Sequence, residues 1–263
     1  MPIVLAVVQE KGGVGKTTTT NALARCLADM GHKVLVLDGD SQGNATSNIL
    51  PDHQEILAKG KTLYEVVKKT IDPSEAIYRT PEGFDIIPST DSLAALNDEL
   101  SPLPSRERVL AKIIRGSKAL QGYDFILIDS LAAVGTWFFN ILAAARYTIT
   151  PITPEINAVE GLDNLKETID AIQEDINPEL KMGAVFVNQM TEGQIVDKMI
   201  LENLVKRKSQ GLPLMDTQIR KAAVVRQAEL CGKTVLEYAP KHRVSDEFRA
   251  LTLEIKQRLT ETK

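Results

Sequence analysis

The chain is poor in several kinds of residue, and each shortage excludes a class of protein. It has 263 residues but only 2 cysteines, Cys26 and Cys231, which are too few and too far apart for a disulfide framework. Its 3 histidines are scattered without the spacing of a metal site. No stretch approaches the roughly 18 uninterrupted apolar residues that a membrane-spanning helix needs. These absences favour a cytoplasmic protein with reduced thiols.

Charge and length further limit the class of protein and the number of domains. The net charge of −4 argues against a protein that binds nucleic acid over its whole surface, although it leaves room for a local basic surface. The chain begins Met-Pro and then turns apolar without a basic segment, so we expect no signal peptide. With 43% hydrophobic residues and no linker rich in proline or glycine, residues 1–263 are expected to form a single domain.

The most informative segment is the glycine-rich stretch 9–20, which lies between an apolar run typical of a buried strand and a helical pattern that stops at Gly31. In a phosphate-binding loop, glycines let backbone N–H groups approach the phosphates. A lysine reaches the β- and γ-phosphates, and the next hydroxyl binds Mg²⁺. We therefore predict nucleotide binding here, with Thr17 as a Mg²⁺ ligand. The predicted nucleotide-binding residues are Gly12, Gly13, Val14, Gly15, Lys16, Thr17 and Thr18.

This loop departs from the strict phosphate-loop pattern at its start. The pattern has a glycine five residues before Gly15, where this chain has Glu10 followed by a second lysine, Lys11. The segment Lys-Gly-Gly-Val-Gly-Lys-Thr-Thr resembles the deviant Walker A motif of the ParA/MinD ATPases. The resemblance implies that Lys11 reaches across a nucleotide-sandwich dimer to the partner's phosphates and couples ATP binding to dimerisation. The alternative is that Lys11 is a solvated loop lysine.

Carboxylates follow two further strand-like runs. One run leads into Asp38 and Asp40, and another ends at Asp129. Carboxylates beside a phosphate site can hold Mg²⁺, often through water, or orient an attacking water. The resemblance places the water-activating role on Asp40, a Mg²⁺-side role on Asp38 and the Walker B role on Asp129. The predicted catalytic residues are Lys11, Lys16 and Asp40, and the predicted metal ligands are Thr17, Asp38 and Asp129.

Two loops differ from the family pattern. Ser41 stands where proline is usual, and the residues after Asp129 read Ser-Leu-Ala-Ala-Val-Gly in place of the usual x-Pro-Pro. Trp137 and two phenylalanines come just beyond the second loop. These differences indicate an altered switch loop or an altered dimer contact. The alternative is that the aromatic residues only pack in the core at the start of a helix, and we favour this alternative for them.

The last strand-like run ends at Asn188. A side-chain amide offers both a donor and an acceptor to a base edge, and the resemblance implies that Asn188 contacts adenine. The alternative is an asparagine that only caps the strand. Arg220 replaces a proline of the family's second base-contacting loop.

Cations gather in the last third of the chain. Relatives of the partition type use this region for nonspecific DNA binding once dimerised, and such binding is sensitive to salt. The alternative is a solvated basic helix face. The predicted DNA contacts are Lys206, Arg207, Lys208, Arg220, Lys221 and Arg226, with Arg220 and Lys221 at the N-terminus of a helix over residues 219–230.

Strand-like and helical segments alternate, which predicts an α/β fold: a single doubly wound, mostly parallel sheet with helices on both faces, as in P-loop NTPases. The expected strands span residues 3–8, 33–37, 84–88, 123–128, 147–151 and 182–187. The expected helices lie near residues 17–30, 62–69, 91–99, 105–119, 136–145, 155–173, 193–209, 219–230 and 245–260. Residues 50–60 are expected to form a loop.

The resemblance implies an ATPase that partitions a plasmid or chromosome. ATP and Mg²⁺ would close a homodimer that binds DNA nonspecifically. A ParB-like or adaptor protein would accelerate slow hydrolysis and release the DNA. The protein would be cytoplasmic and would associate with the nucleoid when ATP-bound.

Features at both ends of the chain bear on the alternatives. We expect no helix-turn-helix extension before the loop, and therefore no operator binding. The closing helix lacks the separate apolar tail of MinD-like relatives, which disfavours a stable membrane anchor. The alternatives are an ATPase that positions a protein cargo, a MinD-like division regulator at the membrane, or an adaptor of metallocluster assembly. The last is weakened by the absence of a Cys-x-x-Cys pair.

Overall fold

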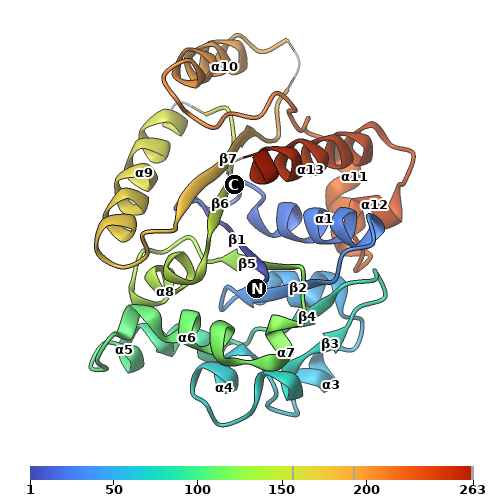
Figure 1. Ribbon diagram of the computed structural model, residues 1–263. Coiled ribbons are helices and arrows are strands. Elements are labelled where there is room, and N and C mark those ends of the chain that lie inside the picture. The colour runs from blue at the N-terminus through green and yellow to red at the C-terminus, as the bar shows by residue number, and fades with distance from the viewer. Residues whose placement is uncertain (156, 192, 262–263) are drawn as a thin grey trace.

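A seven-stranded sheet forms the centre of the computed structural model, which describes residues 1–155, 157–191 and 193–261 (Figure 1). The strand order is β3-β4-β2-β5-β1-β6-β7. The parallel strands are β1 (Ile3–Val7), β2 (Val34–Gly39), β4 (Asp85–Ile87), β5 (Phe125–Ser130), β6 (Tyr147–Ile152) and β7 (Lys181–Val187). The edge strand β3 (Tyr78–Arg79) runs antiparallel to β4 and was not predicted. The predicted fold class is confirmed.

Helices cover both faces of the sheet (Figure 1). One face packs against α1 (Lys16–Asp29), α11 (Ala223–Leu230), α12 (Val235–Tyr238) and α13 (Arg243–Glu261). The other packs against α4 (Leu63–Val67), α5 (Leu96–Leu100), α6 (Val109–Gly116), α7 (Lys118–Gln121), α8 (Thr136–Ala144) and α9 (Ala158–Asp175). Short elements complete the chain: α2 (Asn44–Ile49), α3 (His53–Leu57), η1 (Pro73–Ala76), η2 (Asp91–Ala95) and η3 (Arg106–Arg108). Helix α10 (Ile195–Lys208) lies at the periphery, beyond β7.

The apolar run of β1 explains its central position. Leu5 and Val7 contribute to the core on one face, whereas Val4 and Ala6 contribute to the core on the other. Side chains alternate along a strand, so an uninterrupted apolar run suits a strand that is covered on both faces. The loop that follows β1 therefore emerges at the carboxyl edge of the sheet, where ligands of this fold bind.

The closing helix α13 packs on the domain as its apolar spacing predicts. Phe248, Leu251, Ile255 and Leu259 are all buried in the core beside α1. Helical spacing places these side chains on one face. Among the described helices, none combines the length and apolar character required to cross a bilayer.

Several element bounds differ from expectation. The helix expected from residue 219 begins at Ala223, so the prediction that Arg220 and Lys221 lie at its N-terminus was wrong. The backbone of this segment instead hydrogen-bonds beside the end of β7, where Met190 N donates to Ile219 O and Lys221 N donates to Met190 O. Helices α2 and α3 were missed, α3 within the expected loop. Ile156, in the helix expected over 155–173, lies outside the described residues.

Candidate nucleotide-binding site

The phosphate loop joins β1 to α1 through glycines with left-handed backbone conformations. Gly13 has φ 76° and Gly15 has φ 87°, a region that favours glycine. A Cβ atom on Gly15 would lie 2.4 Å from the side-chain nitrogen of Asn188. Two independent constraints therefore require glycine at position 15. The turn they permit directs the N-terminus of α1 and its free N–H groups toward the site, where they favour an anion.

Two amide side chains hold this loop in place from the end of β7. Asn188 Nδ2 donates to Val14 O at 2.7 Å, and Gln189 Nε2 donates to Gly13 O at 2.8 Å. The Asn188 Oδ1 atom accepts from Gln189 N at 3.0 Å. Asn188 was predicted to contact adenine, and here both polar atoms of its amide are bonded within the protein. The loop-holding role was missed, although the Asn-Gln pair directly after a strand was its signal.

Lys16 is the buried cation of the loop. Its side-chain nitrogen donates to Lys11 O at 3.2 Å, and the residue is 8% exposed. Burial lowers the pKa of the Lys16 ammonium, while the charges of Asp129 and Asp40 act in the opposite direction. An ammonium that has lost most of its water gains more from a nearby phosphate than an exposed one would.

Asp129, the residue predicted for the Walker B role, is the next-to-last residue of β5 and is fully buried. It accepts hydrogen bonds from Thr17 Oγ1 at 2.7 Å and from Thr20 Oγ1 at 3.2 Å. Burial raises the pKa of the Asp129 carboxyl, and the neighbouring charge of Asp38 adds to the shift. The predicted metal ligands Thr17 and Asp129 therefore lie together.

Asp38 occupies the facing position on β2. It stands opposite Asp129 in the parallel register of β2 and β5. It accepts from Thr46 N at 2.8 Å and from Thr46 Oγ1 at 2.6 Å, and burial raises the pKa of its carboxyl. Two adjacent carboxyls and a threonine hydroxyl supply the oxygen ligands that Mg²⁺ prefers, so the residues present fit this ion. The third acid, Asp40, is half-buried and lines the cavity described next.

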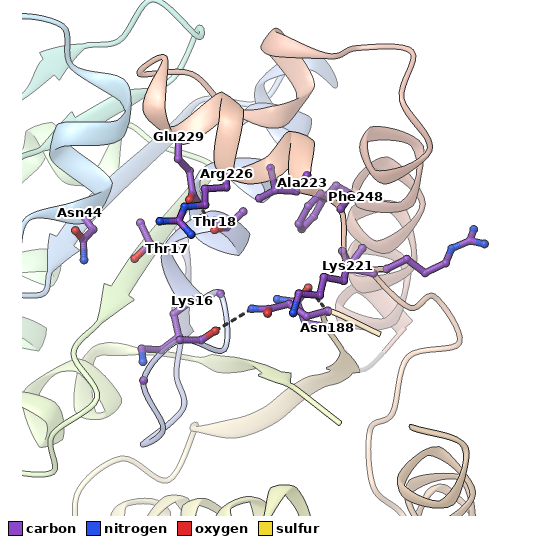
Figure 2. Close-up of a pocket in the computed structure, with 18 of the residues that line it drawn as sticks. Lys16, Thr17, Thr18, Asn44, Asn188, Lys221, Ala223, Arg226, Glu229 and Phe248 are labelled. Atoms are coloured by element: carbon purple, nitrogen blue, oxygen red, sulfur yellow. Dashed lines mark hydrogen bonds between the residues drawn. The ribbon is translucent and has the colours of Figure 1, made fainter. Parts of the chain in front are cut away.

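A cavity of about 730 Å³ opens over the loop (Figure 2). Its volume is within the range of small-molecule sites. One wall is the phosphate loop and the start of α1. The opposite wall comes from residues 219–229 and from Phe248 of α13. The lining residues include Gly12, Gly13, Gly15, Lys16, Thr17, Thr18, Asp40, Asn188, Arg220, Lys221, Arg226 and Glu229.

The second lysine of the loop faces outward. Lys11 is exposed, and its ammonium pairs with the exposed carboxylate of Glu155. This hydrogen bond, followed by the charge of Lys11, lowers the pKa of Glu155. Lys11 therefore lies at the rim, separate from the buried Lys16.

The cations predicted to contact DNA lie on two parts of the fold, the last turn of α10 and the cavity wall. Arg207 pairs with Asp163, and Lys208 pairs with Asp216, near the end of α10. Arg220 binds the nearly buried Glu247 through both its backbone N–H and its guanidinium. Three further members are exposed: Lys206 on α10, and Lys221 and Arg226 on the cavity wall.

The aromatic residues after the proline-free loop are core residues, as favoured. Trp137 and Phe138 are buried against the sheet. The indole nitrogen of Trp137 also donates to Gly39 O at 2.8 Å, next to the acids of β2. That link was missed. Ala132, in the same loop, lines the cavity.

Comparisons with known proteins agree with this geometry. The family model described as AAA domain matches residues 3–182. The sporulation initiation inhibitor protein Soj of Bacillus subtilis is 31% identical over 253 residues, covering 96% of this chain and 97% of the relative. The chain belongs to the ParA/Soj family of partition ATPases. The chromosome-partitioning ATPase Soj of Thermus thermophilus is 30% identical to this ParA/Soj chain over 257 residues, covering 98% of this chain and 96% of the relative.

The fold of the chain is also similar to those of solved structures. Cobyrinic acid a,c-diamide synthase from Mycobacterium smegmatis, solved with bound ADP and magnesium, has a TM-score of 0.85 and 25% identity. The match covers 100% of the ParA/Soj chain and 97% of the synthase. The cell division ATPase MinD of Pyrococcus furiosus shares the fold, with a TM-score of 0.78, 22% identity and coverage of 98% and 99%. The ParA/MinD resemblance drawn from the loop is confirmed.

Proposed function

We propose that this ParA/Soj family member is an ATPase for partition of plasmid or chromosomal DNA. In this proposal Mg²⁺–ATP closes a homodimer, the dimer binds DNA nonspecifically, and a ParB-like or adaptor protein stimulates hydrolysis and releases the DNA. The observation that carries the proposal is the pairing of one buried lysine, Lys16, with one outward-facing lysine, Lys11, in the same phosphate loop.

The chemistry assigned to the site follows from its residues. Lys16 and the N-terminus of α1 would bind the phosphates. Thr17 would hold Mg²⁺ together with Asp38 and Asp129, which would act through bound water. The ion neutralises phosphate charge when bound. Asp40 is half-buried on the cavity wall, which supports its role in orienting the attacking water.

Lys11 is suited to act on a partner's nucleotide. Its ion pair with Glu155 is exposed on both sides, and exposed ion pairs contribute little to stability because water screens them. Exchanging Glu155 for a phosphate would therefore cost little. A cation supplied at the transition state can accelerate phosphoryl transfer by roughly 10³–10⁵, so hydrolysis would be slow until the dimer and its partner are in place.

We assign DNA binding to exposed lysines. Lys206 is exposed on α10, and Lys208, in the same last turn, pairs with the highly exposed Asp216. Helix α10 lies at the periphery of the molecule, where a long polyanion has access (Figure 1). Lys221 is a further exposed cation. Such contacts would place the ATP-bound protein on the nucleoid within the cytoplasm.

The experiment is binding to random-sequence duplex DNA with ATP, with ADP and without nucleotide, over a salt series. We expect salt-sensitive binding with ATP only, weakened in Lys206→Gln/Lys208→Gln. Arg115→Gln, on α6 away from the cavity, is the control for surface charge. Arg220→Ala is a poor test because it would leave the nearly buried Glu247 without this partner. Absence of DNA binding in every nucleotide state would reject DNA as the partner and favour a membrane or protein scaffold.

A further inference from the structure

Helix α11 faces the start of α1 across the cavity. Thr18 Oγ1 donates to Glu229 Oε1 at 2.5 Å, which ties the two helices together. Arg226 precedes Glu229 by three residues, so both side chains project from the same side of α11. The Glu229–Thr18 hydrogen bond therefore fixes where Arg226 lies relative to the phosphate loop.

Arg226 is directed into the cavity. It lines the same space as Lys16, Thr17 and Thr18, and in Figure 2 it extends from α11 toward the labelled threonines. Arg207 pairs with Asp163, whereas no carboxylate pairs with Arg226 in the part of the chain that the structure describes. A guanidinium that faces a phosphate site without an acidic partner is available to an anionic ligand.

The order of the loop residues indicates which phosphate Arg226 faces. In a phosphate loop the lysine reaches the β- and γ-phosphates and the next hydroxyl binds Mg²⁺ between them. Thr18 is the next residue in the first turn of α1, so we infer that a group beside it meets the α-phosphate, which Lys16 and Thr17 do not hold. Arg226 extends toward Thr17 and Thr18 from the opposite wall of the cavity (Figure 2).

We propose that Arg226 binds the α-phosphate of the nucleotide and makes α11 part of the nucleotide site. The inference rests on the proposed nucleotide binding at this cavity. Lys16 and Arg226 then hold the phosphate chain from opposite walls. A guanidinium can donate two parallel hydrogen bonds to a phosphate, which an ammonium cannot do with the same geometry. The assignment removes Arg226 from the predicted DNA contacts.

The test uses displacement of a fluorescent ADP analogue by AMP, ADP and ATP, because all three carry an α-phosphate. We expect Arg226→Gln to weaken all three by a similar factor, about tenfold for one charged hydrogen-bonding group. Arg226→Lys should recover part of the loss. Arg115→Gln is the matched control and should leave the three affinities unchanged. Lys16→Ala should instead weaken ADP and ATP far more than AMP.

Two results would overturn the assignment while leaving the proposed function intact. One is wild-type nucleotide affinity in Arg226→Gln, especially if DNA binding falls, because that would return Arg226 to the DNA surface. The other is a loss confined to ATP, which would place the guanidinium at the γ-phosphate. By contrast, a wild-type protein that binds none of the nucleotides would reject the proposed function itself.

Discussion

The two sides of the nucleotide site are built in opposite ways. On the side of the strand ends, here called the sheet wall, Asp38 and Asp129 are fully buried outside the cavity lining, and threonine hydroxyls bind both carboxyls. On the α11 side, Lys221 and Arg226 are exposed. The two carboxyls of the sheet wall are thus fixed before any ligand arrives, because each already accepts hydrogen bonds. The α11 wall carries exposed cations that an anionic ligand could pair with.

This difference follows from the elements that form each wall. The backbones of neighbouring parallel strands are held by regular hydrogen bonds. The carboxyls near the ends of these strands therefore have well-defined positions. The segment before α11 is joined to β7 by a few backbone bonds and to α13 by the contact of Arg220 with Glu247. Substitutions at the phosphate loop and the sheet wall should therefore abolish nucleotide binding or hydrolysis. Substitutions at the rim or on the α11 wall should change only the affinity for a ligand or a partner.

The largest effect is expected at the buried lysine. Lys16→Ala should abolish ATP binding, lowering affinity by at least about 1,000-fold, because the phosphate charge would lose its buried counter-charge. Isothermal titration calorimetry measures the affinity, and the unfolding temperature without nucleotide controls for folding. Unchanged affinity in a folded variant would refute the assignment of the phosphate site.

A smaller effect is expected at Asp40, which meets the cavity while remaining half-buried. Asp40→Ala should keep ATP binding and the dimer but lower turnover by roughly 10²–10⁴, the usual contribution of a positioned base. Phosphate release in the presence of the stimulating partner measures turnover. If the variant hydrolyses ATP at the normal rate, another residue orients the water.

At the rim, Lys11 should control assembly more than binding. Lys11→Ala should block ATP-induced dimerisation while the monomer still binds ATP through Lys16. Light scattering with ATP and Mg²⁺ measures the mass. Glu155→Gln is the matched control, since it removes the partner of Lys11 and keeps the lysine, and should still dimerise. A dimer formed by Lys11→Ala would make Lys11 an ordinary loop lysine.

The smallest effect concerns stability without ligand. A buried carboxyl with a raised pKa keeps its proton to higher pH in the folded state than in the unfolded state. The stability it contributes is therefore complete below the unfolded pKa of about 4 and is lost as pH rises through the raised value. Asp129→Asn should remove this loss and stabilise the nucleotide-free protein at pH 8 by about 1–3 kcal/mol.

Thermal unfolding at pH 5 and pH 8 tests this expectation. The asparagine keeps one acceptor oxygen for the hydroxyl of Thr17 or Thr20, and its Nδ2 can donate to the other hydroxyl, so both contacts of Asp129 have a replacement. Wild type should regain the difference when Mg²⁺ and ATP are added, and Asp129→Asn should not. A variant less stable than wild type at pH 8 without nucleotide would show that the hydrogen bonds outweigh the burial of charge.

The sheet wall could be predicted from the sequence and the α11 wall could not. The apolar runs that lead into Asp38 and Asp129 predict that the two carboxyls lie close together, because parallel strands end at the same edge of the sheet. The position of Arg226 depends on Glu229 meeting Thr18, a contact between residues 211 positions apart. The extended path of Arg220 and Lys221 depends on the free edge of β7. Neither pairing leaves a periodic pattern in the sequence.

The contact between Trp137 and Gly39 has a practical consequence. The chain holds 1 tryptophan, and its indole donates to the backbone of the strand that leads into Asp38 and Asp40. Any rearrangement of that strand end changes the surroundings of the only strongly emitting chromophore. The intrinsic emission spectrum of the unlabelled protein is therefore a built-in optical reporter, which could follow in real time how the carboxyls at this strand end respond to a ligand.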